Sequence, residues 1–402
     1  MKKLICSAIS ILIASVAPAH AQEKVSDGIV KIGVITDLSG LYSDNVGPGS
    51  VLATRLAVED FGGKVLGKPI EIVTIDHHNK ADIASAKVRE WIDRDKVDVI
   101  TELGSSAVAL AAMKIGAEKN RITMVTGAGA TRISGEDCTP TNFHWVYDTF
   151  ALANVASKEM VARGGSSWFY IAADYAFGHA LENDGTRVVK DAGGTVLGSA
   201  RYPMPGSDFS SYLLRAQASG AKVVALANAG MDTQNAIKQA KEFGLTQKQQ
   251  VVAMLMSIAD VHSLGLEQAQ GMYFTETFYW DLNDDSRKFA RRFFEKHKRM
   301  PTALQAGQYS AVLSYLKAVQ AAGTDDTNAV VSKIRSMPIN DAFAKNGKVR
   351  ADGKMIHDNY LVQVKAPKES KTPWDYYRIV KTVPGEQAYS SLADSKCPLV
   401  KK

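Results

Sequence analysis

The chain has 402 residues, of which 48 are basic and 42 acidic, giving a net charge of +6 at pH 7, and 46% are hydrophobic. The small positive excess does not predict binding to nucleic acid or to an anionic membrane surface. The length and the ordinary hydrophobic content fit a globular protein of two domains.

The first residues have the pattern of a secretory signal. Met1-Lys2-Lys3 precedes an apolar run from Leu4 to Val16 and the small-x-small site Ala19-His20-Ala21. This pattern predicts a signal peptide over 1–21 that is cleaved before Gln22. The apolar run is shorter than the roughly 20 residues that a spanning helix needs. We therefore expect an exported, soluble protein.

Two cysteines, Cys138 and Cys397, remain after export. An oxidising compartment favours a disulfide between them, which would fix the C-terminal tail to an earlier loop. Two free, buried thiols are the alternative.

Strand and helix patterns alternate in the first third of the chain. Apolar runs predict strands at 30–36, 70–76, 97–103 and 122–126, and helical patterns lie between them at 50–61, 82–95 and 107–120. Strands that are separated by helices of this length indicate a parallel sheet.

The same rhythm restarts near Ala151. Helices are predicted at 151–163, 177–192, 209–219 and 232–243, and strands at 167–172, 195–201, 222–227 and 251–256. Helices at 284–298, 303–321 and 328–337 and a strand pair at 360–364 and 376–380 follow. The late helices suggest a return to the first domain. We place short crossings between the domains near 145–147, 274–278 and 350–357.

Gly104-Ser105-Ser106 lies between a predicted strand and a predicted helix. Two hydroxyls and the free amides of a helix N-terminus would meet there, which favours binding of a small anion such as a carboxylate. A serine N-cap is the alternative. The turn lacks the second glycine of a hydrolase nucleophile elbow, which argues against hydrolysis.

Other motifs argue against an enzyme or a metal site. Gly127-Ala128-Gly129 begins a partial dinucleotide fingerprint, but Arg132 stands at the third glycine position and no periodic helix follows. His77 and His78 are adjacent and lack further ligands at metal-binding spacing, so we expect surface histidines. We predict no enzyme activity, no cofactor and no metal.

Several residues follow predicted strands, where doubly wound sheets bind ligands. Tyr42 comes after the first strand, Tyr175 and Phe177 after the first strand of the second domain, and Asn228 and Asp232 after a later one. A surface position for Tyr42 and a core position for Phe177 are the alternatives.

Taken together, these segments resemble the leucine/isoleucine/valine-binding branch of the periplasmic substrate-binding proteins of ABC importers. The similarity covers about 29–400 and is carried by the order and spacing of six segments: Lys31-Ile32-Gly33-Val34 with Leu38-Ser39-Gly40, Gly104-Ser105-Ser106, Gly127 to Thr131, Tyr175-Ala176-Phe177-Gly178, Phe209-Ser210-Ser211-Tyr212-Leu213 and Phe278-Tyr279-Trp280.

The resemblance implies an α/β fold of the type I periplasmic binding proteins. Two Rossmann-like lobes with parallel sheets flanked by helices would be joined by three hinge crossings. We expect lobe 1 over 22–145 and 277–352, and lobe 2 over 146–276 and 353–402, with the C-terminal tail returning to the hinge and lobe 1.

The resemblance also implies a ligand between the lobes. In that family the serine turn holds the ligand carboxylate and the Gly/Ala run supplies backbone contacts. The expected ligand-binding residues here are Tyr42, Ser105, Ser106, Thr126, Ala128, Ala130, Tyr175, Phe177, Asn228, Asp232, Met256 and Phe278.

One departure bears on the ligand. Amino-acid binders of this type place an acidic residue after a late strand of the second lobe, whereas the matching stretch here is Met254-Leu255-Met256-Ser257. A buried ammonium without a partner is costly, so we expect an aromatic or otherwise apolar carboxylate. The alternative keeps an amino acid, with its ammonium on Asp232.

We therefore expect a monomeric, periplasmic protein that captures a small carboxylate and delivers it to the permease of an ABC importer in the inner membrane. A periplasmic ligand sensor of the same fold is a further alternative.

Overall fold

A computed structural model describes residues 25–401 of the protein. The predicted signal peptide and its cleavage site lie outside the described residues. Within the described part of the chain, no helix is long and apolar enough to cross a membrane.

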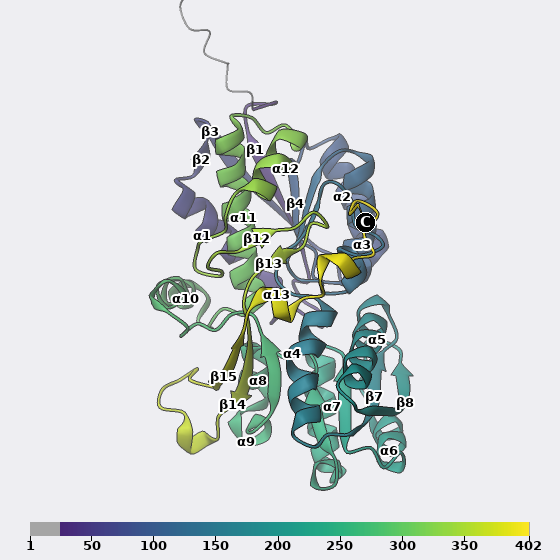
Figure 1. Ribbon diagram of the computed structural model, residues 1–402. Coiled ribbons are helices and arrows are strands. Elements are labelled where there is room, and N and C mark those ends of the chain that lie inside the picture. Colours follow the sequence, from purple (N-terminus) through teal and green to yellow (C-terminus); the bar gives the residue numbers. More distant parts are fainter. Residues whose placement is uncertain (1–24, 402) are drawn as a thin grey trace, which may run out of the picture.

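Lobe 1 is built on a six-stranded sheet in the order β2-β3-β1-β4-β5-β6 (Figure 1). The four predicted strands are confirmed, and they pair in parallel as β1 (Val30–Thr36), β3 (Lys68–Asp76), β4 (Val99–Glu102) and β5 (Ile122–Val125). The sequence analysis missed the short edge strands β2 (Lys64–Val65) and β6 (Asn142–His144).

Helices cover both faces of this sheet because side chains alternate along its strands. On β1, Val30, Ile32 and Val34 belong to one core cluster and Ile35 to another. The first face is covered by α1 (Gly47–Phe61) and α11 (Ala303–Ala322), with α10 (Asp284–His297) and α12 (Thr327–Ser336) beside them. The second face is covered by α2 (Ala81–Asp93) and α3 (Ser106–Glu118).

Lobe 2 contains a four-stranded parallel sheet in the order β10-β9-β7-β8. Its strands are β7 (Ser167–Ala173), β8 (Thr195–Tyr202), β9 (Val223–Ala227) and β10 (Gln250–Ala253). Its helices are α4 (Thr149–Ala162), α5 (Ala176–Asp191), α6 (Ser210–Ala218), α7 (Met231–Glu242), α8 (Ile258–Leu264) and α9 (Leu266–Ala269). The sequence analysis missed α8 and α9.

A second, antiparallel sheet belongs to lobe 2. It consists of β11 (Tyr273–Glu276), β14 (Asn359–Val364) and β15 (Tyr377–Val383), with β14 in the centre. The predicted strand pair near the C-terminus is confirmed. The chain leaves this sheet after Glu276, within the stretch 274–278 where a crossing is predicted, although most of that stretch belongs to β11.

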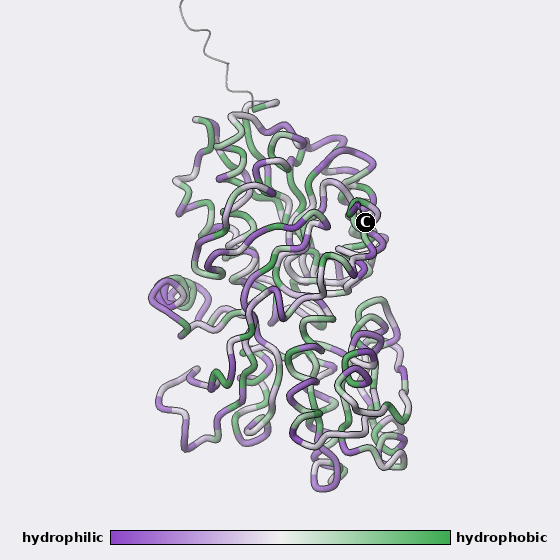
Figure 2. Tube along the Cα trace, viewed as in Figure 1, coloured by the Kyte–Doolittle hydropathy of each residue, from purple (hydrophilic) through white to green (hydrophobic). Residues whose placement is uncertain are grey.

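The lobes are joined by three connections and by the tail. The chain passes from β6 to α4, from β11 to α10, and from the hairpin of β12 (Lys348–Val349) and β13 (Met355–Ile356) to β14. After β15 the tail returns through α13 (Gly385–Ala388), so the C-terminus lies in lobe 1 (Figure 1). Hydrophobic stretches run through the interior of both lobes, and α10 is conspicuously hydrophilic (Figure 2).

The predicted disulfide is present. Cys138 and Cys397 are bonded, with their Cα atoms 5.5 Å apart and 259 residues between them in the sequence. The bond fixes the tail to the loop before β6. His77, by contrast, is not a surface residue as predicted: its side chain is buried, and burial lowers its pKa to about 4. Its Nδ1 accepts a hydrogen bond of 2.8 Å from the amide of Asn79.

Candidate functional site

A cavity lies between the lobes at the carboxyl ends of β1, β4 and β7. We call it the Ser106 cavity. Tyrosine, phenylalanine and leucine side chains dominate its wall, and none of its lining residues is a lysine or arginine. It is lined by Tyr42, Asn45, Val46, Gly104, Ser106, Gly127, Ala128, Tyr147, Tyr175, Phe177, Ala229, Leu255 and Leu304.

The serine turn forms the polar end of this cavity. Ser105 occupies the N-cap position of α3, but its side chain makes no capping hydrogen bond. Its hydroxyl is buried and has no partner among the described residues. The Ser106 hydroxyl accepts a hydrogen bond of 3.2 Å from the amide of Ala130. The first amides of α3 and these two hydroxyls are the donors that the turn offers to an anion, and of the two serines only Ser106 lines the cavity.

The turn is held in an unusual conformation. Glu102 and Leu103, at the end of β4, have φ angles of 78° and 60°, a region that costs energy for non-glycine residues and that is frequent at functional sites. The loop after β5 packs directly against it. A Cβ on Gly127 would come within 2.6 Å of the Gly104 Cα, so only glycine permits this approach.

Glu102 lies beneath the turn and is fully buried. Its carboxylate accepts a hydrogen bond of 3.1 Å from the Gly104 amide, and burial raises its pKa to about 8. The side chain is therefore neutral at pH 7. A neutral Glu102 supports the turn without repelling an anion bound on its other side.

Aromatic side chains from both lobes meet across the cavity. The hydroxyl oxygens of Tyr42 in lobe 1 and Tyr175 in lobe 2 are 2.6 Å apart, and the Tyr42 hydroxyl is also 3.2 Å from the Met204 sulfur. Phe177, at the start of α5, is buried and lines the same wall. Tyr42 is thus a buried cleft residue and not a surface tyrosine.

A second cavity adjoins the first, and we call it the Glu276 cavity. The two cavities share Asn45, Tyr147, Leu255 and Leu304. The second is further lined by Leu152, Met256, Ser257, Thr275, Glu276, Thr277 and Ala303. The cleft therefore continues from the serine turn towards the end of β11.

Comparison with known proteins decides the family. The model of the periplasmic binding protein family matches residues 29–371. The chain belongs to this family. A periplasmic binding protein from Burkholderia mallei has 52% sequence identity and a TM-score of 0.92 over 93% of this chain and 100% of that chain.

Two further relatives agree with this. A branched chain amino acid ABC transporter periplasmic ligand-binding protein from Burkholderia xenovorans has 40% identity and a TM-score of 0.83 over 92% of this chain and all of that one. A Leu/Ile/Val-binding protein homologue from Brucella melitensis is 25% identical over 89% of this chain and 90% of its own length. The protein is thus an ABC-type periplasmic solute-binding protein with the expected α/β fold.

The lobes of this periplasmic binding protein lie in direct contact. The amide of Met231 in lobe 2 donates to the Leu41 carbonyl in lobe 1 at 3.3 Å. A Cβ on Gly230 would lie 2.4 Å from that carbonyl, so glycine is required there. Each of the two cavities measures only about 20 Å³, against roughly 300–1,000 Å³ for typical ligand pockets. The lobes must separate before a ligand can enter.

Not all predicted residues reach these cavities. Thr126 donates to Gln308, and Ala130 contributes its amide to Ser106. The Asn228 side-chain Oδ1 accepts from the Thr233 hydroxyl, and its buried Nδ2 has no partner among the described residues. These three residues and Ser105 line neither cavity.

Asp232 and Phe278 lie away from both cavities. The Asp232 carboxylate accepts from the Tyr202 hydroxyl at 2.9 Å and from the Gly206 amide at 3.0 Å. Phe278 packs between Phe289 and Phe343, with ring centroids 6.2 and 6.4 Å away. Neither contact of Asp232 brings its carboxylate to a cavity where it could bind the ammonium of an amino-acid ligand.

Sequence reasoning missed two buried carboxylates in this region, Asp260 and Glu276. Asp260 is the N3 residue of a capping box that begins at Ser257, and it also accepts from Gln234 at 2.8 Å. Asn45 of lobe 1 donates to it at 3.3 Å. The Ser-x-x-Asp spacing and the place of Glu276 at a strand end were the signals that could have revealed them.

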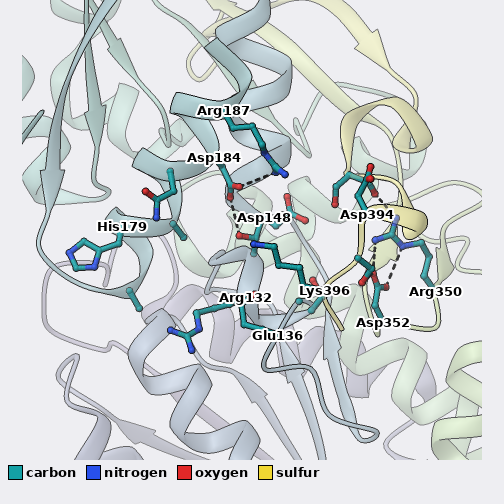
Figure 3. A pocket seen from close by; sticks show the side chains of 18 residues that line it. Arg132, Glu136, Asp148, His179, Asp184, Arg187, Arg350, Asp352, Asp394 and Lys396 are labelled. Atoms are coloured by element: carbon teal, nitrogen blue, oxygen red, sulfur yellow. Dashed lines mark hydrogen bonds and ion pairs between the residues drawn. The ribbon is translucent and has the colours of Figure 1, made fainter. Parts of the chain in front are cut away.

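A larger and more polar cavity of about 370 Å³ lies at the hinge, between α5, the loop after β5 and the tail (Figure 3). Two ion pairs form between residues that line it. Arg187 bonds to Asp184 at 3.2 Å and Arg350 to Asp352 at 2.6 Å. Asp184 also accepts from Thr131 of lobe 1 at 2.9 Å. This arrangement bridges the lobes.

Proposed function

We propose that this periplasmic binding protein captures a small aromatic or otherwise apolar carboxylate and delivers it to the permease of an ABC importer. The observation that carries the proposal is the serine turn, where the buried Ser105 hydroxyl and the first amides of α3 are available beside an apolar cleft. Hydroxyl and amide donors suit a carboxylate, and the aromatic lining suits a flat or apolar body.

The proposal includes the way in which the site works. The carboxylate binds at Ser105 and Ser106 in lobe 1, and the lobes then close over the ligand body with Tyr175 and Phe177 of lobe 2. Closure buries the ligand and gives the permease a distinct shape to recognise. We also propose that the protein is a periplasmic monomer released by cleavage before Gln22, with the lobe boundaries given above.

An amino-acid ligand is the second candidate. The names of the Burkholderia xenovorans and Brucella melitensis relatives favour it, because they refer to branched-chain amino acids. Solved structures of the same fold at 20 and 21% identity include a Rhodopseudomonas palustris protein in complex with benzoate and a leucine-binding protein from Thermotoga maritima. The fold alone therefore accepts both ligand classes.

Thermal-shift screening separates the two candidates. Benzoate- and cinnamate-type acids and leucine are added to the purified protein in parallel, and hits are measured by calorimetry. We expect stabilisation by the aromatic acids. A strong shift with leucine and none with the aromatic acids would refute the apolar-carboxylate proposal. The mass of any ligand that co-purifies with fresh protein identifies the natural compound class.

A further inference from the structure

Glu276 is a buried carboxylate that forms no ion pair among the described residues. Its side chain is 5% exposed and lines the second cavity of the cleft. Among the described residues, its carboxylate meets only backbone donors: the Thr277 amide donates to Oε1 at 3.0 Å, the Phe278 amide also lowers its pKa, and no salt bridge includes it. A buried carboxylate with so few donors is costly unless another donor completes it.

The neighbouring groups do not supply that donor. Asp260 is itself a carboxylate. Burial, and then the charge of Asp260, raise the pKa of Glu276 to about 8, so its side chain is neutral at pH 7 unless a cationic donor pairs with it. The Tyr377 hydroxyl is buried and makes no hydrogen bond to a described residue. Its pKa is raised by burial and then by the charge of Glu276.

Asp260 cannot be the ligand's partner in the same way. Its two oxygens accept from Gln234, from the Ser257 amide and hydroxyl, and from Asn45. It is needed to hold the start of α8 and the contact between the lobes. Glu276 is therefore the carboxylate in this part of the cleft with room for a further donor.

We propose that Glu276 recognises a hydrogen-bond donor, a hydroxyl or an ammonium, at the end of the ligand opposite its carboxylate. This inference rests on the proposed function, because it takes the serine turn as the carboxylate anchor. The ligand class is then a carboxylate with an apolar body and one far-end donor. The body would lie against Leu255 and Leu304, which line both cavities.

Matched pairs of ligands test the proposal by calorimetry. The hydroxyl pair is 4-hydroxybenzoate and 4-fluorobenzoate, and the ammonium pair is 4-(aminomethyl)benzoate and 4-ethylbenzoate. We expect the wild type to bind the donor-bearing member of one pair roughly tenfold more tightly, because a buried acceptor left unpaired is penalised. The pair that shows the preference identifies the donor.

Variants assign the preference to Glu276. Glu276→Met removes the acceptor and should abolish the preference, whereas Glu182→Gln, which removes a lobe 2 carboxylate paired with Arg201 at 2.9 Å, should keep it. Glu276→Gln keeps an acceptor without charge, so a hydroxyl preference should survive within a fewfold and an ammonium preference should disappear. If Glu276→Met does not fold, the shorter Glu276→Asp replaces it, with at least a threefold smaller preference expected.

The outcomes separate this inference from the proposed function. Equal binding within both pairs, or a preference that persists in Glu276→Met, overturns the role of Glu276 while carboxylate binding stands. If none of the four acids binds, the serine anchor and the inference both fail.

Discussion

Replacing Ser105 with alanine separates the two interpretations of the serine turn, because they predict opposite effects on stability. Loss of a serine N-cap costs about 0.5–2 kcal/mol. The Ser105 hydroxyl, however, makes no capping bond and is only 1% exposed. A buried hydroxyl without a partner costs about 1–3 kcal/mol. Removing it should therefore stabilise the ligand-free protein, by about 1 kcal/mol.

The same substitution should weaken ligand binding. A hydrogen bond to a charged group contributes about 1.5–3 kcal/mol, which corresponds to a loss of affinity of roughly 10- to 150-fold. Ser106→Ala gives the comparison. It should also weaken the ligand, but it should destabilise the free protein, because the amide of Ala130 loses the acceptor that it now contacts at 3.2 Å.

Urea unfolding gives the free energy of unfolding of each variant, and calorimetry gives its affinity for the best carboxylate found in the screen. The expected signature of Ser105→Ala is higher stability together with lower affinity. A Ser105→Ala protein that is less stable by about 1 kcal/mol and binds with unchanged affinity would show that the serine is only a cap.

Three further predictions concern the surroundings of the site. Burial raises the pKa of Glu102 to about 8, so the affinity for a carboxylate should be constant below that pH and fall above it, where Glu102 becomes charged. Calorimetry across pH 6–10 should show this fall in the wild type and not in Glu102→Gln. Tyr42→Phe removes the hydroxyl contact with Tyr175 and should enlarge the radius of gyration of the free protein in X-ray scattering; an unchanged radius would argue against a role in closure. Replacing Cys138 and Cys397 with serine should lower the free energy of unfolding by about 2–4 kcal/mol in urea, and unchanged unfolding would contradict a stabilising bond.

The alternation of apolar strands and helices was enough to predict most of the fold. The central strands of the parallel sheets, such as Val30–Thr36 and Val223–Ala227, are buried on both faces, so their apolar runs are conspicuous in the sequence. The missed elements are short or lie at edges. Strand β6 has three residues, and α8 begins at Ile258 directly after a polar cap that looks like a loop.

The candidate site was predictable only where position followed from topology. Tyr42 and Phe177 come directly after strands, and both line the Ser106 cavity. Asp232 satisfies the same rule, but its carboxylate turns towards Tyr202 and Gly206. The direction of a polar side chain at a helix start depends on which residues elsewhere in the fold form its hydrogen bonds. The sequence alone does not show which residues those are. Glu276 was hidden for a related reason, because β11 looked like a crossing.

The division of the proposed site between the two lobes determines which ligand contacts can favour the closed form. A ligand shifts the equilibrium between open and closed forms only through contacts that differ between them. In the proposed site Ser105 and Ser106 both belong to lobe 1, so they would hold the carboxylate whether the lobes are open or closed and would contribute to affinity without driving closure. Contacts with lobe 2, such as those of Phe177, exist only in the closed form.

Without ligand, a few polar contacts hold the lobes together. Asn45 with Asp260, Tyr42 with Tyr175, Met231 with Leu41, and Thr131 with Asp184 are each worth about 0.5–1.5 kcal/mol. Moving an equilibrium from 1:99 to 99:1 takes about 5.5 kcal/mol of differential binding. That energy must come from the ligand body and its far end against lobe 2. Acids that share the same carboxylate can therefore bind with similar affinity and still differ in how strongly they close the protein, and under the proposed function it is closure that the permease recognises.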